Sequence, residues 1–335
     1  MEHIKHARTE REEKVKQLTQ TLEAGVKDLF ESDRYKEYLS VMSRFPKYSA
    51  NNCALILMQN PDATAVAGIK HWNSLGRSIA PGEKGLQIIQ PAPRKVYRHK
   101  TARDQDGNVI YNEDGTAKQE LVLHNYMNFT VGHVWDYSQT VGPTGTELPS
   151  MVKILDSNPE NAEALQLALA ATTSAAVCYE DFIGRANGYY DRLSHRIVVK
   201  ASLPPLQKTK TLAHECCHSI LHCEEGIEIE ANRHEKEIES ESISFIICSY
   251  YGLDTSDYSF GYIQSYASSK TVPELQTKME VIRKTAASMI EKIDEELERL
   301  IVVQKEVEEQ KPMRQEVAVF TVQDRQHTSY HHRRR

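Results

Sequence analysis

The chain has 335 residues, of which 40% are hydrophobic and 26% are charged, and its formal net charge is −6. This composition is typical of a globular protein, and the length is sufficient for two domains. No apolar stretch is long enough to span a bilayer, and the first residues are polar, so we exclude a membrane protein and expect a cytoplasmic one. The acidic balance also excludes a uniformly basic nucleic-acid binder.

The first half of the chain is predicted to begin with helices and to continue with extended segments. Apolar residues recur at helical spacing, Ser49 is a favourable N-cap, and two Asp-Gly pairs indicate tight turns. The predicted elements are helices over 9–30, 34–43 and 49–59, short extended or mixed segments at 66–72 and 86–90, an exposed β excursion over 100–119, a strand over 128–137, and a linker over 138–149.

The second half is predicted to be mainly helical, with one short strand beside a motif-bearing helix. The expected elements are a helix over 159–178, a strand over 196–200, a helix beginning near 207, a helix over 237–251, a long helix over 273–310, and a disordered tail over 311–335. Six cysteines show no regular spacing, so we expect free thiols. Cys216 and Cys217 are expected to be buried apolar positions rather than metal ligands.

Positive charge is concentrated in one segment, which we call the basic island (residues 40–103). It contains ten Lys or Arg residues and two acidic ones. A positive surface with interleaved aromatic rings is typical of proteins that bind single-stranded DNA. The candidate DNA contacts are Arg44, Lys47, Tyr48, Asn51, Trp72, Arg77 and Lys84. The alternative is that Tyr48 and Trp72 belong to the core and that the basic residues are scattered over the surface.

The most specific motif is His-Glu-x-x-His at His214-Glu215-Cys-Cys-His218. Positions i and i+4 of a helix lie on one face, so both imidazoles can bind one Zn²⁺. Glu215 is then placed to take a proton from the water that such a metal activates, as a general base. A third protein ligand is needed, and the run of acidic residues over 237–241 offers carboxylates on the next helix. A chance occurrence of the pattern on a charged helix is the alternative.

Both halves of the chain resemble the ArdC-like antirestriction family, which includes LtrC-like relatives on mobile elements. In the first half the resemblance rests on Tyr48-Ser-Ala-Asn-Asn52, Leu55-Ile56, Gln59-Asn60-Pro61, Trp72, Gly76-Arg77, Gly82-Glu-Lys-Gly85 and Asp136-Tyr-Ser-Gln-Thr140. In the second half it rests on Gly188-Tyr189-Tyr190, on the segment from His214 to His222, and on the segment from Glu237 to Phe245. The first group is similar to an N-terminal single-stranded-DNA-binding domain and the second to an ImmA/IrrE-type metallopeptidase domain.

The resemblance implies an α+β protein with two domains. One is an α+β single-stranded-DNA-binding domain over residues 1–145, and the other is a mainly helical, gluzincin-like metallopeptidase domain with a small sheet over 150–310. In such relatives the third zinc ligand lies in a Glu-Ala pair. Here Glu239-Ser240 occupies that pair, so Glu239 is the implied ligand and Glu241 the second choice. His222 is implied to orient the site without binding the metal.

Three functions remain open from the sequence. The preferred one is a zinc-dependent, single-stranded-DNA-binding antirestriction protein of a mobile element. The second is a zinc metallopeptidase whose substrate is a protein or peptide, such as a repressor, with Glu215 as base and Tyr189 or Tyr190 as an oxyanion donor. The third is a non-catalytic zinc scaffold, which three ligands and an open position argue against.

Overall fold

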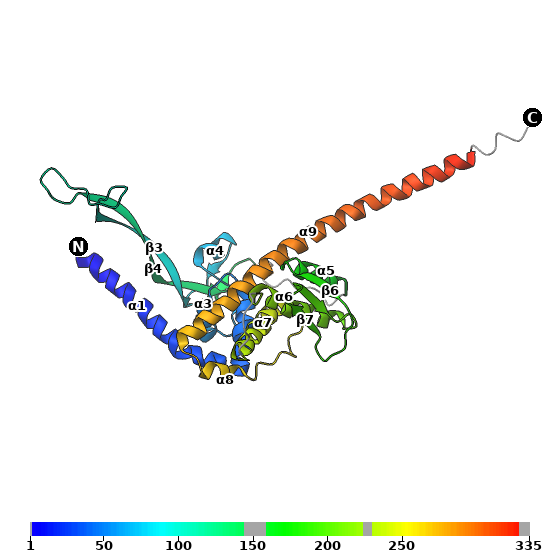
Figure 1. Cartoon of the computed structure of the whole chain (residues 1–335), viewed down its shortest axis with the longest axis horizontal. Coiled ribbons are helices and arrows are strands. Elements are labelled where there is room, and N and C mark those ends of the chain that lie inside the picture. The colour runs from blue at the N-terminus through cyan, green and yellow to red at the C-terminus, as the bar shows by residue number, and fades with distance from the viewer. Residues whose placement is uncertain (1, 144–158, 224–229, 328–335) are drawn as a thin grey trace, which may run out of the picture. The chain divides into compact units, whose positions relative to one another are not determined.

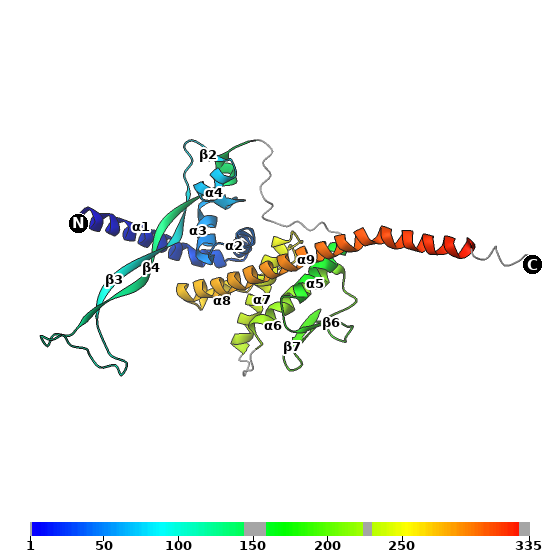
Figure 2. The same cartoon turned by 90° about the horizontal axis from the view of Figure 1, so that it is seen from above.

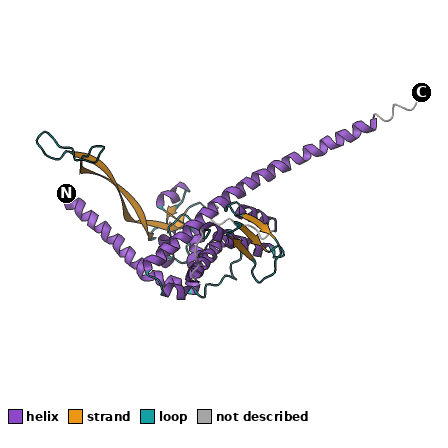
Figure 3. Cartoon of the chain, viewed as in Figure 1, coloured by secondary structure: helices purple, strands orange, loops and turns teal. Residues whose placement is uncertain are grey.

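The computed structural model describes residues 2–143, 159–223 and 230–327, and the chain divides into two compact units. The first unit contains Met1–Met151 and Phe260–Glu280, and the second contains Val152–Ser259 and Val281–Arg335. Each unit combines helices with sheet, so the fold is two-domain α+β, as predicted (Figures 1 and 3). Among the described residues, no helix has both the length and the apolar content needed to cross a bilayer.

The helices of the first unit pack around a small aromatic and aliphatic core. Phe30, Tyr35 and Phe260 are almost fully buried, and the ring of Tyr35 packs edge-on against Phe260 at 5.1 Å. Ser49 caps a helix as predicted, because its hydroxyl accepts a hydrogen bond from the Asn52 amide. The elements are α1 (Glu2–Val26), η1 (Lys27–Phe30), α2 (Ser32–Arg44), α3 (Ala50–Gln59), α4 (Ile69–Ser74) and α8 (Ile263–Ser268).

Two long antiparallel strands, β3 (Leu86–Thr101) and β4 (Gln119–Asp136), form a ribbon that extends from this core (Figure 2). The predicted segments at 86–90 and 128–137 are therefore the inner ends of much longer strands. We call the paired residues beyond Pro91 and Phe129 the arm (residues 91–129). Its end is made of tight turns, as the Asp-Gly pairs predicted, with isolated bridges Arg103↔Val109 and Tyr111↔Ala117.

Short strands and one carboxylate hold the base of the ribbon in place. β1 (Val66–Ala67) pairs with β4, while β2 (Ser78–Ile79) pairs with β5 (Thr140–Val141), which follows η2 (Tyr137–Gln139). The start of the predicted linker over 138–149 is thus ordered structure, and residues 144–149 lie outside the described part of the chain. The buried Asp136 carboxylate accepts backbone hydrogen bonds from Thr64 at 2.7 Å, Ala65 at 2.9 Å and Ser138 at 2.9 Å.

Replacing Asp136 by Asn is expected to lower the free energy of unfolding by about 2–3 kcal/mol, since a charged acceptor of several buried hydrogen bonds is lost. Burial acts to raise the pKa of Asp136, but the hydrogen bonds from Ser138, Ala65 and Thr64 outweigh it and the pKa falls below its ordinary value. This contribution is fully present above the unfolded-state pKa, near 4, and is lost as the pH falls through the folded-state pKa. Urea unfolding at pH 7 and pH 3 measures both effects, with the exposed Asp62→Asn as control.

The second unit places one helix between two other helices and a small sheet. α6 (Pro205–Leu221) contacts α5 (Pro159–Ala170), α7 (Glu230–Tyr250) and two strands of the sheet. The sheet has the order β6-β8-β7, with β8 (Arg196–Val199) parallel to β6 (Ala176–Tyr179) and antiparallel to β7 (Gly188–Asp191). Cys216 and Cys217 are fully buried on α6, as predicted, and every described cysteine is a free thiol.

Several sequence-based predictions for the second unit differ from the structure in extent or position; the helix expected from residue 237, for example, begins at Glu230. The predicted helix over 159–178 ends at Ala170, because the Thr172 hydroxyl bonds the Leu169 carbonyl and the following residues form β6. The predicted strand at Arg196 is correct in type but lies in the middle of the sheet, so the edge strand beside α6 is β7. The last helix, α9 (Val272–His327), continues past the predicted end at residue 310.

Candidate functional site

The two motif histidines meet on one face of α6. Residues four apart on a helix lie one above the other, and the Nε2 atoms of His214 and His218 are 3.0 Å apart. The imidazoles are partly exposed, at 26% and 16% of the side chain. The pair therefore faces open space as well as the protein, which a site for a metal and a substrate requires.

α7 brings Glu237 to the same point. Its Oε2 lies 3.4 Å from His214 Nε2 and its Oε1 lies 3.7 Å from His218 Nε2. Ligand atoms about 2.0 Å from a tetrahedral Zn²⁺ would be about 3.3 Å from one another. The three observed separations bracket that value, and among the described residues His214, His218 and Glu237 form the one group of this kind that could hold a metal ion. The donor set, two imidazoles and one carboxylate, also fits zinc.

The carboxylate that lies beside the two histidines is not the one that the sequence resemblance implies as a ligand. Glu239, the implied ligand, points its Oε2 at His222 Nε2, 2.8 Å away, and this pair is buried. Glu241, the second choice, lines a separate pocket beside His214. Glu237 and Glu241 lie one helical turn apart, so both are on the face of α7 that is turned toward the histidines. Glu239 lies two residues from each and faces nearly the opposite way.

Glu239 and His222 instead form a chain of contacts behind His218. His218 Nδ1 lies 3.0 Å from His222 Nδ1. If the Glu239 carboxylate accepts the proton of His222 Nε2, then His222 Nδ1 accepts the proton of His218 Nδ1 and leaves the His218 Nε2 lone pair free for a metal. Such outer partners fix the tautomer and orientation of metal-binding histidines. The orienting role implied for His222 agrees with this geometry.

Glu215 is buried beside the histidines. Burial raises the pKa of Glu215 to about 7, the nearby Glu237 carboxylate adds to this, and His214 and a hydrogen bond from the Tyr190 backbone oppose it. A carboxylate with a pKa near neutrality is suited to accept and return a proton. Gly188 allows β7 to approach so closely, because a Cβ there would lie 2.6 Å from Thr211 Cγ2 on α6.

The two histidines have opposite pKa shifts. Burial lowers the pKa of His214, but hydrogen bonding to Glu237 and the charges of Glu215, Glu237 and Glu241 outweigh it, so the net shift is upward. Burial lowers the pKa of His218, and the neighbouring His214 and His222 lower it further, so the net shift is downward despite Glu237. The Glu237 carboxylate therefore favours positive charge at this point, where a divalent cation would add it.

The two tyrosines suggested as oxyanion donors, Tyr189 and Tyr190, make contacts away from the histidines and Glu237. The Tyr190 hydroxyl hydrogen-bonds His195 Nδ1 at 2.8 Å, and the ring of Tyr189 packs edge-on against Phe182. Tyr189 is 43% exposed. Both tyrosines nevertheless line the larger of the two pockets at this site, but their contacts assign them no chemical role.

Two pockets adjoin Glu215 and His214. The metal pocket, about 550 Å³, also contains His218, Glu237 and the basic residues Arg192, Arg233 and Lys236. The side pocket, about 330 Å³, extends from Glu215 toward the start of α6; its remaining lining residues are Asn187, Gly188, Gln207, Lys210, Thr211, Glu241, Ser244, Asp257 and Tyr258. An extended ligand could therefore occupy space on both sides of the metal position.

Two of the predicted DNA contacts are structural residues of the first unit. Trp72 is 2% exposed and its Nε1 donates to the Trp135 carbonyl at 2.9 Å. Arg77 is 7% exposed, donates to the Thr140 hydroxyl at 2.7 Å, and lies 4.0 Å from the ring centroid of Tyr137. The alternative reading, in which Trp72 belongs to the core, describes this geometry.

The remaining predicted contacts vary in exposure. Arg44 donates to the carbonyls of Ser40 and Ala63. The Tyr48 hydroxyl donates to the Val66 carbonyl at 3.1 Å, so its ring is only half-exposed. The members of the set that are exposed or half-exposed and have no recorded side-chain hydrogen bond are Lys47, Lys84 and Asn51.

The arm carries exposed residues that the predicted contact set did not include. Residues paired across antiparallel strands share a face, so the register defines two faces. One face presents exposed Tyr97, Leu121, Leu123, Met127 and Phe129, together with Lys95. The other face presents Arg94, Arg98 and Lys100, and the Arg98 guanidinium lies 5.1 Å from the ring centroid of Tyr126. The basic island includes these cations, so its charge count indicates them. That they lie on one face follows only from the strand pairing.

Comparison with known proteins divides the chain in the same order as its motifs. Residues 8–131 match the N-terminal domain of anti-restriction factor ArdC, and residues 125–241 match the family described as "Putative metallopeptidase family (DUF6782)". An uncharacterized protein of Bacillus anthracis, pXO2-81, is 26% identical over 79% of this chain. The match covers 48% of that protein, so the chain spans about half the length of this curated relative.

Solved structures of the antirestriction ArdC protein from the R388 plasmid are also similar. The metal-free structure has a TM-score of 0.44 and 15% identity, covering 75% of this chain and 86% of that chain. The Mn(II)-bound structure has a TM-score of 0.43 and 15% identity, covering 75% and 85%. The two domain matches give the chain an ArdC-type N-terminal domain over residues 8–131, followed over residues 125–241 by a segment of the putative metallopeptidase family that contains His214, His218 and Glu237.

Proposed function

We propose that this chain is a single-stranded-DNA-binding, antirestriction-type protein of a mobile element, and that its second unit is a Zn²⁺ metallopeptidase domain. The observation that carries the proposal is the convergence of His214, His218 and Glu237 beside the buried Glu215. Three protein ligands leave a fourth position for water or substrate, which is the arrangement of catalytic rather than structural zinc.

The chemistry of the second unit follows from the residues around this point. Zn²⁺ held by the three ligands would supply a Lewis acid that polarises a peptide carbonyl and lowers the pKa of water. Glu215 accepts the proton of the attacking water, which its pKa of about 7 permits at neutral pH. The same carboxyl then returns the proton to the leaving amine. Glu239 and His222 hold the His218 ring in place during these steps.

β7 is suited to align an extended substrate. It is an edge strand of its sheet and contacts α6. The Lys200 amide donates to the Asn187 carbonyl, and alternation along an antiparallel pair directs the backbone groups of Gly188 and Tyr190 away from β8. The Tyr190 backbone amide hydrogen-bonds the Glu215 carboxylate. The backbone amide and carbonyl of Gly188 are therefore the groups expected to pair with a substrate strand. Such strand addition favours a protein or peptide substrate, including a regulatory protein such as a repressor.

The arm supports the DNA-binding part of the proposal. On one face its stem carries Arg94, Arg98 and Lys100, with the Arg98 guanidinium over the Tyr126 ring, and on the other face it carries Lys95 beside the exposed rings of Tyr97 and Phe129. Cationic groups that track phosphates and rings on which bases stack are what single-strand binding needs. The end of the arm is acidic: residues 102–118 contain four Asp or Glu and two Lys or Arg. DNA is therefore expected on the stem, with Lys47 and Lys84 as additional contacts.

Substituting Arg94, Arg98 and Lys100 together by Gln is expected to lower the slope of log affinity against log salt by about 2, since each lost phosphate contact to a single strand removes about 0.7. Substituting Tyr97 and Phe129 by Ala should weaken binding by about 1–3 kcal/mol for each stacked base, without changing the slope. Fluorescence anisotropy with labelled single- and double-stranded oligonucleotides over a salt series measures both.

The matched control replaces three exposed cations of α9, Lys284, Lys292 and Arg299, by Gln. This variant should keep the wild-type salt slope. A wild-type protein without salt-dependent binding at low ionic strength would exclude the DNA-binding proposal. A slope that falls equally in both triple variants would move the DNA interface away from the arm.

A further inference from the structure

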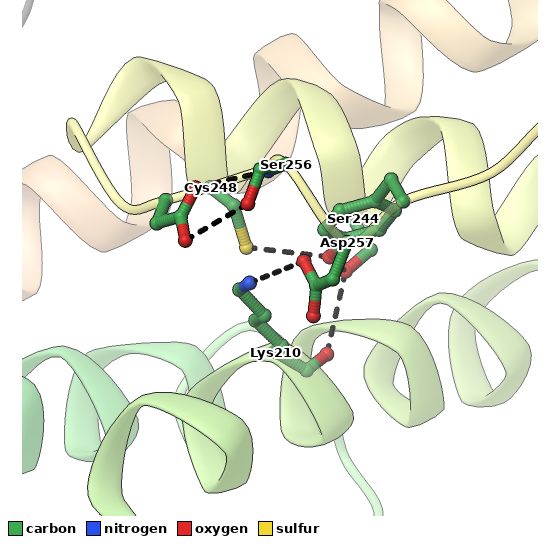
Figure 4. Close-up of polar contacts among 7 residues, drawn as sticks. Lys210, Ser244, Cys248, Ser256 and Asp257 are labelled. Carbon is green, nitrogen blue, oxygen red and sulfur yellow. Dashed lines mark hydrogen bonds and ion pairs between the residues drawn. The ribbon is translucent and has the colours of Figure 1, made fainter.

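The side pocket has a polar wall that the proposed hydrolysis does not use. Lys210 lies one helical turn before His214 on α6 and therefore faces the same way. Its Nζ is 2.6 Å from Asp257 Oδ1, and it lies 5.6 Å from the ring centroid of Tyr258 (Figure 4). A lysine next to the catalytic position would by itself attract a substrate carboxylate.

The exposed fractions of Lys210 and Asp257 lead to the opposite expectation, attraction of a cation. The Lys210 side chain is 7% exposed, whereas that of Asp257 is 54% exposed. The ammonium therefore lies behind the carboxylate, and a ligand that enters the side pocket meets Asp257 first. The charge of Lys210 is already compensated by this short ion pair, since opposite charges at such a distance form a strong, charge-assisted hydrogen bond.

Hydrogen bonds fix this wall in position. The Ser244 hydroxyl on α7 is 3.3 Å from the Lys210 backbone carbonyl and 2.7 Å from the Tyr258 hydroxyl. Ser244 has one proton, which it donates to the carbonyl, so Tyr258 donates to Ser244. The loop that carries Asp257 is further ordered by Asp254, which accepts from the Ser256 amide and hydroxyl, both at 3.0 Å (Figure 4). The Asp257 carboxylate is thus held at the pocket by both α6 and α7.

Acidic side chains outnumber basic ones around the side pocket. Asp257, the half-buried Glu241 and Glu215 line it, together with the ion-paired Lys210 and the imidazole of His214. The metal pocket differs, because three basic residues, Arg192, Arg233 and Lys236, line it together with Glu215 and Glu237. A cationic side chain is therefore better matched by the side pocket.

We infer that the side pocket binds a basic side chain, Lys or Arg, of the substrate residue next to the scissile bond, with Asp257 as the main specificity-determining residue and Glu241 as its companion. The inference rests on the proposed peptidase function, because it assigns a substrate class to that site. It makes the substrate a protein or peptide cut beside a basic residue.

The test measures binding rather than turnover. Zn²⁺-loaded full-length protein is titrated with four hydroxamates, those of L-arginine, L-norleucine, L-glutamic acid and acetic acid, by isothermal calorimetry. The hydroxamate group binds the metal in all four, and only the side chain differs. Arginine hydroxamate is expected to bind about tenfold more tightly than the norleucine and glutamate compounds, as for one hydrogen bond to a charged group.

Variants separate the side pocket from the metal site. Asp257→Asn exposes the Lys210 ammonium and should transfer the preference from arginine to glutamate hydroxamate, whereas Glu163→Gln, an exposed carboxylate on α5, should keep the arginine preference. The double variant Lys210→Met/Asp257→Asn leaves no unpaired buried charge and should show a reduced arginine preference even if the single variant folds poorly.

The outcomes distinguish two failures. If no hydroxamate binds, acetohydroxamate included, the proposed metal site is wrong. If all four bind wild-type protein equally, or if Asp257→Asn keeps the arginine preference, the metal site stands and the substrate class inferred here is wrong.

Discussion

Replacing Glu215 by Gln is expected to lower the rate of peptide hydrolysis by at least about 10³-fold while leaving Zn²⁺ bound, because the amide keeps the shape of the side chain but cannot accept a proton. The buried position of Glu215 beside His214 and its pKa near 7 make it the base of the proposed reaction. Cleavage of a quenched-fluorescent peptide library measures the rate, and metal analysis of the same samples measures zinc content.

The control for this substitution is Glu163→Gln, an exposed carboxylate on α5, which should leave both rate and zinc content unchanged. Hydrolysis that survives in Glu215→Gln would show that another group is the base. Wild-type protein that binds zinc but cleaves no member of the library would favour the non-catalytic scaffold over the peptidase.

Glu237 and Glu239 are expected to differ in their effect on metal affinity. Glu237→Ala removes a ligand of the proposed zinc site and should weaken binding by about 10³-fold or more, whereas Glu239→Ala removes an outer partner and should weaken it by about 10–100-fold. The difference arises because Glu237 lies beside the Nε2 atoms of His214 and His218, whereas Glu239 hydrogen-bonds the ring of His222. Competition titration with a zinc-sensitive dye measures both affinities.

Thermal unfolding gives an independent readout of the same difference. Zn²⁺ at about 1,000 times its Kd should add about 4 kcal/mol to the stability of the wild-type second unit, and this gain should disappear in Glu237→Ala. A loss of affinity in Glu239→Ala that exceeds the loss in Glu237→Ala would return the third ligand to Glu239, the residue implied by the sequence resemblance.

The sequence predicts those parts of the site that depend on spacing within one helix. His214, Glu215 and His218 follow from a five-residue pattern, since their relative positions are fixed by helical geometry. The third ligand requires the register of α7 against α6, and this depends on tertiary packing. Glu237, Glu239 and Glu241 are the same residue type, so the available guide is a family pattern with two mismatches, Ser240 and Ser244.

The same difference between local and long-range signals decides which parts of the first unit can be predicted. Helices with clear periodicity and a capping Ser49 are predictable, because these signals are local. The length of the arm is not, because it depends on eleven cross-strand pairs, from Pro91↔Phe129 to Thr101↔Gln119. The burial of Trp72 and Arg77 also depends on long-range contacts, because the Trp135 carbonyl and the Thr140 hydroxyl accept their hydrogen bonds. A basic or aromatic residue therefore identifies a candidate interface only after its partners are known.

Zinc K-edge X-ray absorption of Zn²⁺-loaded full-length protein tests the proposed metal centre most directly. The expected spectrum has nitrogen and oxygen neighbours at about 2.0–2.1 Å, with two imidazoles per zinc, and the imidazole signal should disappear in the His214→Ala/His218→Ala variant. A sulfur neighbour at about 2.3 Å would assign the metal to cysteine and contradict the site. A fourth protein ligand would close the open position and contradict a catalytic role.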